Sequence, residues 1–167
     1  MWKTRGKNVI ILKIQNQNEA MYIACQMERG AVKHYARAMQ LMQAMGRENE
    51  PLFSALKAML HDEESHLEQF CAFTDCDSIS PERQTLLNAL MQDWLFKGGL
   101  MGAAREGMME DIPSMMQYAQ ASEELSARKY REFAEMTDDE ATRQALLAIA
   151  AEEDKHYLEL NTSPDHT

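Results

Sequence analysis

A Glu and a His three residues apart, Glu63 and His66, lie in an apolar helical pattern, and the same pair recurs at Glu153 and His156. Three residues along a helix bring two side chains to one face, so a carboxylate and an imidazole can reach the same ion. The neighbours of the first pair at helical spacing are apolar: Leu56, Met59, Leu67 and Phe70. Buried polar groups of this kind cost folding free energy unless a partner satisfies them. The repeated pair therefore indicates a helical fold with a polar site inside its core.

The composition agrees with such a fold. The chain has 167 residues, enough for one domain with a substantial core. It contains only four Pro and seven Gly, and long stretches show helical apolar periodicity. We therefore predict an all-α protein.

Four long helices are predicted from these patterns. The first runs from about Asn18 to Met45, before Gly46, and the second begins at Pro51 and continues to about Phe73. The third runs from about Pro113 to Met136. The fourth runs to about Leu160, with Thr137 as its N-cap and Glu140 completing a capping box.

Residues 74–111 are too many for a tight turn between antiparallel neighbours, and we predict a crossover along a bundle. Ser80 and Pro81 begin an extra helix within it, which Gly98 and Gly99 end, and residues 100–111 are expected to be irregular or partly helical. The apolar stripe around Trp94 is expected to be exposed and suggests a homo-oligomer, such as a dimer. The bundle is expected to span residues 18–160, followed by a disordered tail, 161–167.

Residues 1–17 are left unassigned among a short strand, a frayed arm and an appended extension. Their apolar run, Val9 to Leu12, is too short for a secretory signal and is interrupted by Lys13.

Each half of the chain carries a further Glu on its first long helix. Glu28 lies seven residues before Tyr35, and Glu123 lies seven residues before Tyr130. Each half is therefore a predicted helical hairpin with a Glu on one helix and Glu-x-x-His on the other. Four carboxylates and two imidazoles would meet in the centre of a bundle, which is a ligand set for two divalent metal ions.

Other residues were weighed for the same site. Glu124 shares a helix face with Arg128 and Arg131, which is typical of a solvated row of ion pairs, so Glu123 is favoured. His34 and His61 lie off the ligand faces and are predicted to be surface residues. Tyr35 and Tyr130 are either core aromatics or hydrogen-bond donors to ligand carboxylates.

Charge and cysteine content exclude several functions. A formal net charge of −10 argues against nucleic acids and anionic membranes as partners. No apolar run is long enough to span a bilayer. The three cysteines form no Cys-x-x-Cys pair, so no zinc ribbon or rubredoxin-type iron site is encoded, and a reducing, cytoplasmic location is expected.

The chain resembles the rubrerythrin family of the ferritin-like superfamily. The residues that carry the resemblance are Glu28-x-x-Ala31-x-x-x-Tyr35, Glu63-x-x-His66, Glu123 with Tyr130, and Glu152-Glu153-x-x-His156. The resemblance covers roughly residues 18–160 without the crossover. It implies a ferritin-like four-helix bundle that holds two iron ions, although Fe/Mn and Mn/Mn pairs suit the same ligands.

The resemblance also implies roles for the site residues. Glu63 and Glu153 would bridge the metal ions, and Glu28 and Glu123 would be terminal ligands. His66 and His156 would bind one iron each, while Tyr35 and Tyr130 would donate hydrogen bonds to ligand carboxylates.

The implied activity is a di-iron oxidoreductase that reduces peroxide or dioxygen. Two departures from the family matter. The rubredoxin-like domain of full-length rubrerythrins is lacking, so an external electron donor, such as a rubredoxin-like protein, would be needed. Peroxide-reducing members also carry an extra Glu where this chain has Ser126. The alternatives are a ferroxidase or iron-storage module and a metal-free helical interaction protein.

Overall fold

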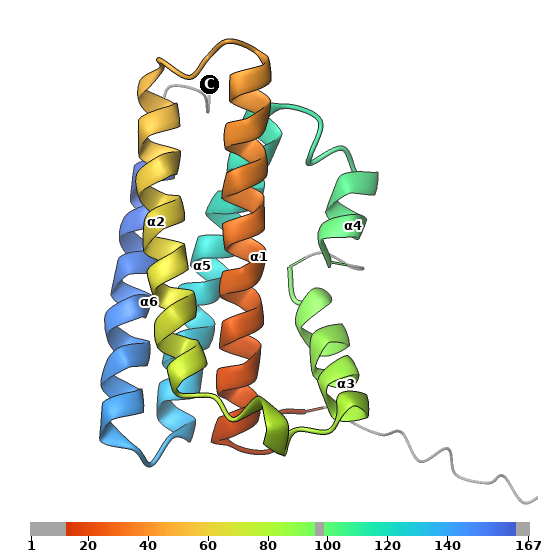
Figure 1. Cartoon of the computed structure of the whole chain (residues 1–167), viewed down its shortest axis with the longest axis vertical. Coiled ribbons are helices and arrows are strands. Elements are labelled where there is room, and N and C mark those ends of the chain that lie inside the picture. Colours follow the sequence, from red (N-terminus) through yellow and green to blue (C-terminus); the bar gives the residue numbers. More distant parts are fainter. Residues whose placement is uncertain (1–12, 96–98, 163–167) are drawn as a thin grey trace, which may run out of the picture.

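Four long helices lie side by side in the computed structural model, which describes residues 13–95 and 99–162 (Figure 1). They are α1 (Gln17–Ala44), α2 (Pro51–Ala72), α5 (Ile112–Met136) and α6 (Glu140–Asn161). Three shorter helices connect α2 to α5: η1 (Cys76–Ser78), α3 (Pro81–Gln92) and α4 (Gly99–Arg105). The described ranges contain no strand, so the all-α prediction is confirmed. Residues 1–12 and 163–167, which carry most of the predicted arm and tail, lie outside these ranges.

The helices begin at the residues that local chemistry favours. Asn16 caps α1 by accepting a hydrogen bond from the Glu19 amide at 2.9 Å. Pro51 begins α2, and Ser80 caps α3 just before Pro81, as predicted. Among the four predicted long helices, α1, α2 and α5 thus begin within a residue or so of their predicted starts.

The predicted cap of the fourth helix is wrong. Asp139, not Thr137, is the N-cap of α6, and its carboxylate accepts a hydrogen bond from the Thr142 amide at 2.8 Å. Thr137 ends α5 instead, where its buried hydroxyl donates to the Gln17 side chain. Glu140 therefore stands at the first helical position, where no capping box can form.

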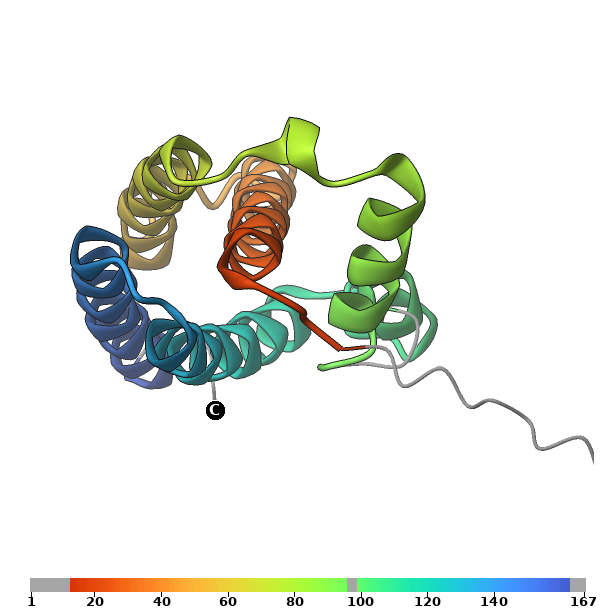
Figure 2. The same ribbon diagram turned by 90° about the horizontal axis from the view of Figure 1, so that it is seen from below.

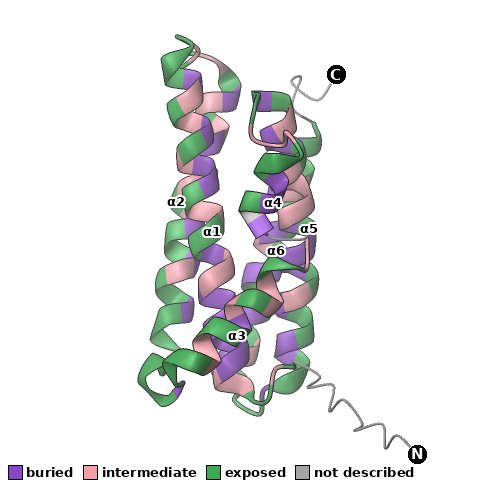
Figure 3. Ribbon diagram, turned by 90° about the vertical axis from the view of Figure 1, so that its right-hand side faces the viewer, coloured by how far each residue is buried: buried purple, intermediate pink, exposed green. Residues whose placement is uncertain are grey.

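The apolar core consists of two clusters stacked along the bundle. The first surrounds residues 20–25 of α1 and includes Phe70, Tyr130, Leu146 and Ile149. The second surrounds residues 35–42 of α1 and includes Leu56, Met59, Met116 and Leu160. Figure 3 shows buried residues recurring along the length of the helices. In every long helix the predicted ligands fall between the residues of the two clusters, so a polar layer divides the core.

The connection from α2 to α5 runs along the outside of the bundle. Figure 1 shows α2 and α5 running in the same direction, with α3 and α4 between the two ends. Seen from below, α3 lies beside α1 and α5 on the side away from α2 and α6 (Figure 2). Helix α3 ends at Gln92, earlier than predicted, and α4 makes the segment predicted to be irregular or partly helical a partly helical one. Gly98 lies outside the described residues, and Gly99 begins α4 rather than ending α3.

The stripe around Trp94 packs against the core rather than lying exposed. Leu87 is fully buried, and Leu90, Met91 and Trp94 pack against the first cluster. The Trp94 ring lies 6.4 Å from the Phe133 ring between centroids, and the Lys129 ammonium lies 4.3 Å from its centre. The expectation of an exposed stripe is therefore wrong, and it no longer supports the prediction of a homo-oligomer.

None of the helices in the described ranges is both long and apolar enough to cross a bilayer.

One ion pair fastens the crossover to the bundle. Arg83 of α3 contacts both carboxylate oxygens of Glu19 in α1, at 2.7 and 2.8 Å, and also donates to the Lys13 carbonyl at 2.6 Å. Only 4% of Glu19 is exposed, so its charge depends on this partner. The hydrogen bond from Arg83 lowers the pKa of Glu19 below its usual value of 4.5.

We expect Arg83→Met to lower the free energy of unfolding by about 2 kcal/mol at pH 7, because it leaves a buried carboxylate without its cation. Because the folded-state pKa of Glu19 is lowered, this contribution is complete above 4.5 and is lost as the pH falls through the lowered value. Urea denaturation at pH 7 and at progressively lower pH measures it. The control is Arg131→Met, which removes an exposed ion pair with Asp154 and should cost less than about 1 kcal/mol. Equal effects of the two variants would contradict the prediction.

Candidate metal centre

All six predicted ligands lie together in the polar layer between the two apolar clusters. Each of the four long helices contributes, and each of these residues is at most 3% exposed: Glu28, Glu63, His66, Glu123, Glu153 and His156. The sequence-based choice of Glu123 over Glu124 agrees with the structure, because Glu123 is buried and Glu124 is exposed.

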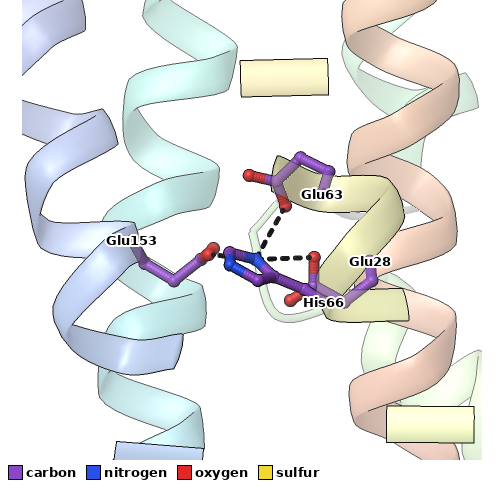
Figure 4. Close-up of side chains that lie close together, drawn as sticks. All are labelled: Glu28, Glu63, His66 and Glu153. Atoms are coloured by element: carbon purple, nitrogen blue, oxygen red, sulfur yellow. Dashed lines mark ion pairs between the residues drawn. The ribbon is translucent and has the colours of Figure 1, made fainter. Parts of the chain in front are cut away.

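The ligand atoms form two overlapping groups, in each of which all atoms lie within 4.8 Å of one another. One group contains Glu28, Glu63, His66 and Glu153 (Figure 4). The other contains Glu63, Glu123, Glu153 and His156. Glu63 and Glu153 belong to both groups, which is the arrangement that two carboxylates shared between two ions require. Each group also has one carboxylate and one imidazole of its own.

Each imidazole directs one ring nitrogen, Nδ1, toward this cluster. His66 Nδ1 lies 3.0 Å from Glu153 Oε1 and 3.7 Å from oxygens of both Glu28 and Glu63. His156 Nδ1 lies 2.8 Å from Glu63 Oε1 and 3.6 Å from Glu123 Oε2. The two rings are stacked with their centroids 6.1 Å apart.

These contacts are short, yet the atoms do not form hydrogen bonds. Within the described ranges, seven buried atoms of the cluster lack a hydrogen-bond partner: Glu28 Oε2, both Glu63 oxygens, His66 Nδ1, Glu123 Oε2, Glu153 Oε1 and His156 Nδ1. Native proteins rarely leave so many buried polar atoms unsatisfied in one place. Oxygen and nitrogen lone pairs that converge without hydrogen bonds are suited to metal ions, so the residues fit a dinuclear centre.

The opposite nitrogen of each imidazole is held by a carboxylate from the other half of the chain. His66 Nε2 lies 2.8 Å from Glu152 Oε2, and His156 Nε2 lies 3.1 Å from Asp62 Oδ2. A carboxylate can only accept, so each Nε2 carries the proton and each Nδ1 is directed to the cluster. The roles of Asp62 and Glu152 were both missed from the sequence. The available signal was that an acidic residue directly precedes both Glu63 and Glu153.

Each of the two tyrosines also donates a hydrogen bond to a carboxylate in the other half of the chain. Tyr130 donates to Glu28 Oε1 at 2.5 Å, and Tyr35 donates to Glu123 Oε1. Burial raises the pKa of both phenols well above the usual value, so both remain protonated donors. The predicted contacts between these tyrosines and the ligand carboxylates are thus present, while the metal they would support stays a prediction.

One histidine outside the cluster was misassigned. His34 was predicted to be a surface residue but is 3% exposed, and its Nε2 lies 2.9 Å from the Met115 carbonyl. It packs against Tyr118 on the α5 side of α1. His61 is exposed, as predicted.

A cavity of about 330 Å³ reaches the cluster from the side of the crossover. Its lining includes Tyr35 and Glu123, together with residues of α1, α3 and α5 such as Ala31, Met91 and Ala119. A small molecule in this cavity would therefore contact one predicted ligand and the tyrosine that donates to it.

Charges within the cluster are balanced by protons when no cation is bound. Burial and the charge of Glu63 raise the pKa of Glu28, and burial and the charge of Glu28 raise that of Glu153. Burial alone would lower the pKa of His156, but contacts with Glu123 and Glu63 raise it to about 11. Burial would raise the pKa of Glu63, but the two imidazoles lower it to about 2. Protons thus occupy a region where cations would be electrostatically favoured.

Comparison with protein-family models, curated proteins and solved structures finds no match for this chain. Its function must therefore be inferred from the residues and their geometry.

Binding of Mn(II), a probe that avoids redox chemistry, is expected to release more than one proton per chain at pH 7. The reason is that Glu28 and Glu153, whose pKa values are raised, and the imidazoles must lose protons to become ligands. A pH indicator in weakly buffered solution measures the release, and the apparent affinity should increase with pH. Metal uptake without proton release would contradict the assignment of these residues as ligands.

Glu153→Gln should separate metal binding from folding. The raised pKa of Glu153 favours its neutral, protonated form in metal-free protein, and Gln has nearly the same shape. We therefore expect a change of less than about 1 kcal/mol in unfolding free energy in the presence of a chelator. At 100 times its Kd, Mn(II) should stabilise the wild type by about 2.7 kcal/mol and leave the variant unchanged. Urea denaturation with and without Mn(II) measures both effects.

Proposed function

We propose that this chain is a ferritin-like, dinuclear iron oxidoreductase that reduces peroxide or dioxygen. The observation that carries the proposal is the pair of overlapping ligand groups that share Glu63 and Glu153. Isolated clusters of acidic residues are common in proteins, but these are buried, include two imidazoles and recur in both halves of the chain. The proposed ligand set is the one typical of di-iron and di-manganese carboxylate bundles.

In this proposal the six side chains have distinct roles. Glu63 and Glu153 would be shared by the two ions, because each belongs to both groups. Glu28 and His66 would complete one position, and Glu123 and His156 would complete the other. The ions would supply the two electrons needed to break the oxygen–oxygen bond of a peroxide.

The remaining residues position the ligands and control protons. Glu152 and Asp62 fix the tautomers of His66 and His156, and thereby direct Nδ1 of each ring to the cluster. Tyr35 and Tyr130 restrain one oxygen each of Glu123 and Glu28, and leave the other oxygen without a protein partner in the described residues. The cavity beside Tyr35 and Glu123 offers a small oxidant access to one side of the centre.

The proposal requires an external donor to return electrons after each turnover, and a rubredoxin-like protein is one such donor. Iron rather than manganese is proposed on the resemblance to rubrerythrins, and Fe/Mn and Mn/Mn pairs remain compatible with the same donor atoms. A cytoplasmic location and the lack of nucleic-acid or membrane partners remain predictions from composition.

We expect purified protein loaded anaerobically with Fe(II) to contain about two transition-metal ions per chain. Elemental analysis measures this content, and Glu63→Ala should lose both ions because it removes a shared ligand. Stopped-flow absorbance should then show faster oxidation of the bound Fe(II) by hydrogen peroxide than by dioxygen.

Other outcomes would replace the proposal. Consumption of many Fe(II) ions per site under air would indicate a ferroxidase or iron-storage module. A chain that binds no stoichiometric metal, with or without the Glu63→Ala change, would be a helical interaction protein instead.

A further inference from the structure

All three cysteines of the chain lie at one end of the bundle. Cys25 is on α1, Cys71 is in the last turn of α2 and Cys76 is in η1, which follows. All three are free thiols. Cys25 is 1% exposed, whereas Cys71 and Cys76 are exposed. None of them contributes to the candidate metal centre.

Two contacts across the α1–α2 interface bring Cys25 and Cys71 together. The Cys25 sulfur lies 3.3 Å from Thr74 Oγ1, and Thr74 follows Cys71 by three residues. In the other direction, Arg29 Nη2 donates to the Cys71 sulfur at 3.8 Å, and Arg29 follows Cys25 by one helical turn. The same two turns are therefore in contact in both directions, which places the Cys25 thiol beside the turn that carries Cys71.

The two thiols differ in ways that assign them different roles. Cys71 is exposed, so a dissolved oxidant can reach its sulfur. Burial raises the pKa of Cys25 to about 12, so this thiol stays protonated and is a poor first target. An exposed thiol beside a covered partner is the arrangement in which a sulfenic acid is resolved into a disulfide.

We infer that Cys71 and Cys25 form a peroxide-reactive dithiol site that is separate from the metal centre. The Cys71 sulfur attacks hydrogen peroxide, an S–O bond forms, the O–O bond breaks and one water leaves. The Cys25 sulfur then attacks the Cys71 sulfur, an S–S bond forms, the S–O bond breaks and a second water leaves. The two thiols are oxidised to one disulfide, and one peroxide is reduced to two waters.

The two cysteines lie close to the candidate metal centre, but their reaction does not require a metal ion. Cys25 lies three residues before Glu28, and Cys71 lies five residues after His66. A Cys25–Cys71 disulfide would join α1 to α2 within about two turns of ligands that both helices contribute. The thiol chemistry itself uses none of the six proposed ligands, so it should proceed in metal-free protein.

The test uses full-length protein treated with a chelator and one equivalent of hydrogen peroxide without air. Thiol titration should show the loss of two of the three thiols, and the intact mass should fall by two hydrogen atoms. Peptide mapping under non-reducing conditions should locate the disulfide between Cys25 and Cys71. A disulfide between Cys71 and Cys76, or three intact thiols, would overturn the assignment.

Three variants sharpen the result. Cys71→Ser should abolish the reaction, whereas Cys76→Ser, the matched change at the other exposed cysteine, should still lose both remaining thiols. Cys25→Ser should stop at a sulfenic acid on Cys71, which dimedone would trap. Dimedone labelling at Cys76 in that variant would contradict the assignment of Cys71 as the first thiol oxidised.

Glu63→Ala separates this inference from the proposed function. It should abolish metal binding and leave disulfide formation intact. Metal uptake by the wild type without disulfide formation would overturn the dithiol site alone, and the reverse result would overturn the metal centre alone.

Discussion

The structure buries four carboxylates and two imidazoles between two apolar clusters, and this burial is unfavourable in free energy unless the groups are compensated. An isolated buried charge is very costly, and such groups must be paired, neutralised by protons or bound to a metal. The raised pKa values of Glu28 and Glu153 and the lowered pKa of Glu63 show how protons distribute over the cluster without a cation. If the bundle had only a structural role, apolar residues at these positions would make the fold as stable or more stable. The polar layer therefore favours a binding role for these residues over a purely structural one.

The hydrogen bonds that position the candidate ligands join the two halves of the chain. Tyr130 in the second half donates to Glu28 in the first, and Tyr35 in the first half donates to Glu123 in the second. Glu152 and Asp62 hold the imidazoles of the opposite halves in the same reciprocal way. Each hairpin thus holds the imidazole of the other hairpin and one of its carboxylates, Glu28 or Glu123. The repeat in the sequence thus encodes a site that exists only when the hairpins pack against each other.

The six candidate ligands could be selected from the sequence because each lies on the helix face that is most strongly apolar, and the structure brings them together. Glu123 was selected over its neighbour Glu124 because Glu124 shares its helix face with Arg128 and Arg131, which is typical of a solvated row of ion pairs. The same reasoning failed for His34, because it considered only one buried face of α1. Residues 19–25 of this helix are all buried, since α1 packs against the crossover and α5 as well as α2.

The crossover was harder to predict for a related reason. Its apolar stripe has the same periodicity whether it covers another helix or contacts a second molecule, so Trp94 was expected to be exposed. The ion pair between Arg83 and Glu19 joins residues 64 positions apart, and no local pattern reveals it. At the start of α6, Thr137 and Asp139 are both good capping residues, and the tertiary contact of Thr137 with Gln17 decides between them.

The symmetry of the ligands is not shared by their surroundings, and this difference bears on what the site can do. Gln120 and Asn161 stand where the second half would need cysteines to match Cys25 and Cys71, at the same distances from Glu123 and His156. The cavity likewise adjoins Glu123 and Tyr35. The thiols therefore lie near the Glu28 and His66 end of the cluster, and the cavity lies near the Glu123 end. Two positions with equivalent donor atoms would thus differ in access to a small oxidant and in proximity to oxidisable sulfur. Because the donor atoms themselves are the same, a difference in reactivity between the two positions would come from their surroundings: the cavity, the thiols, and the Glu152 or Asp62 carboxylate that holds each imidazole.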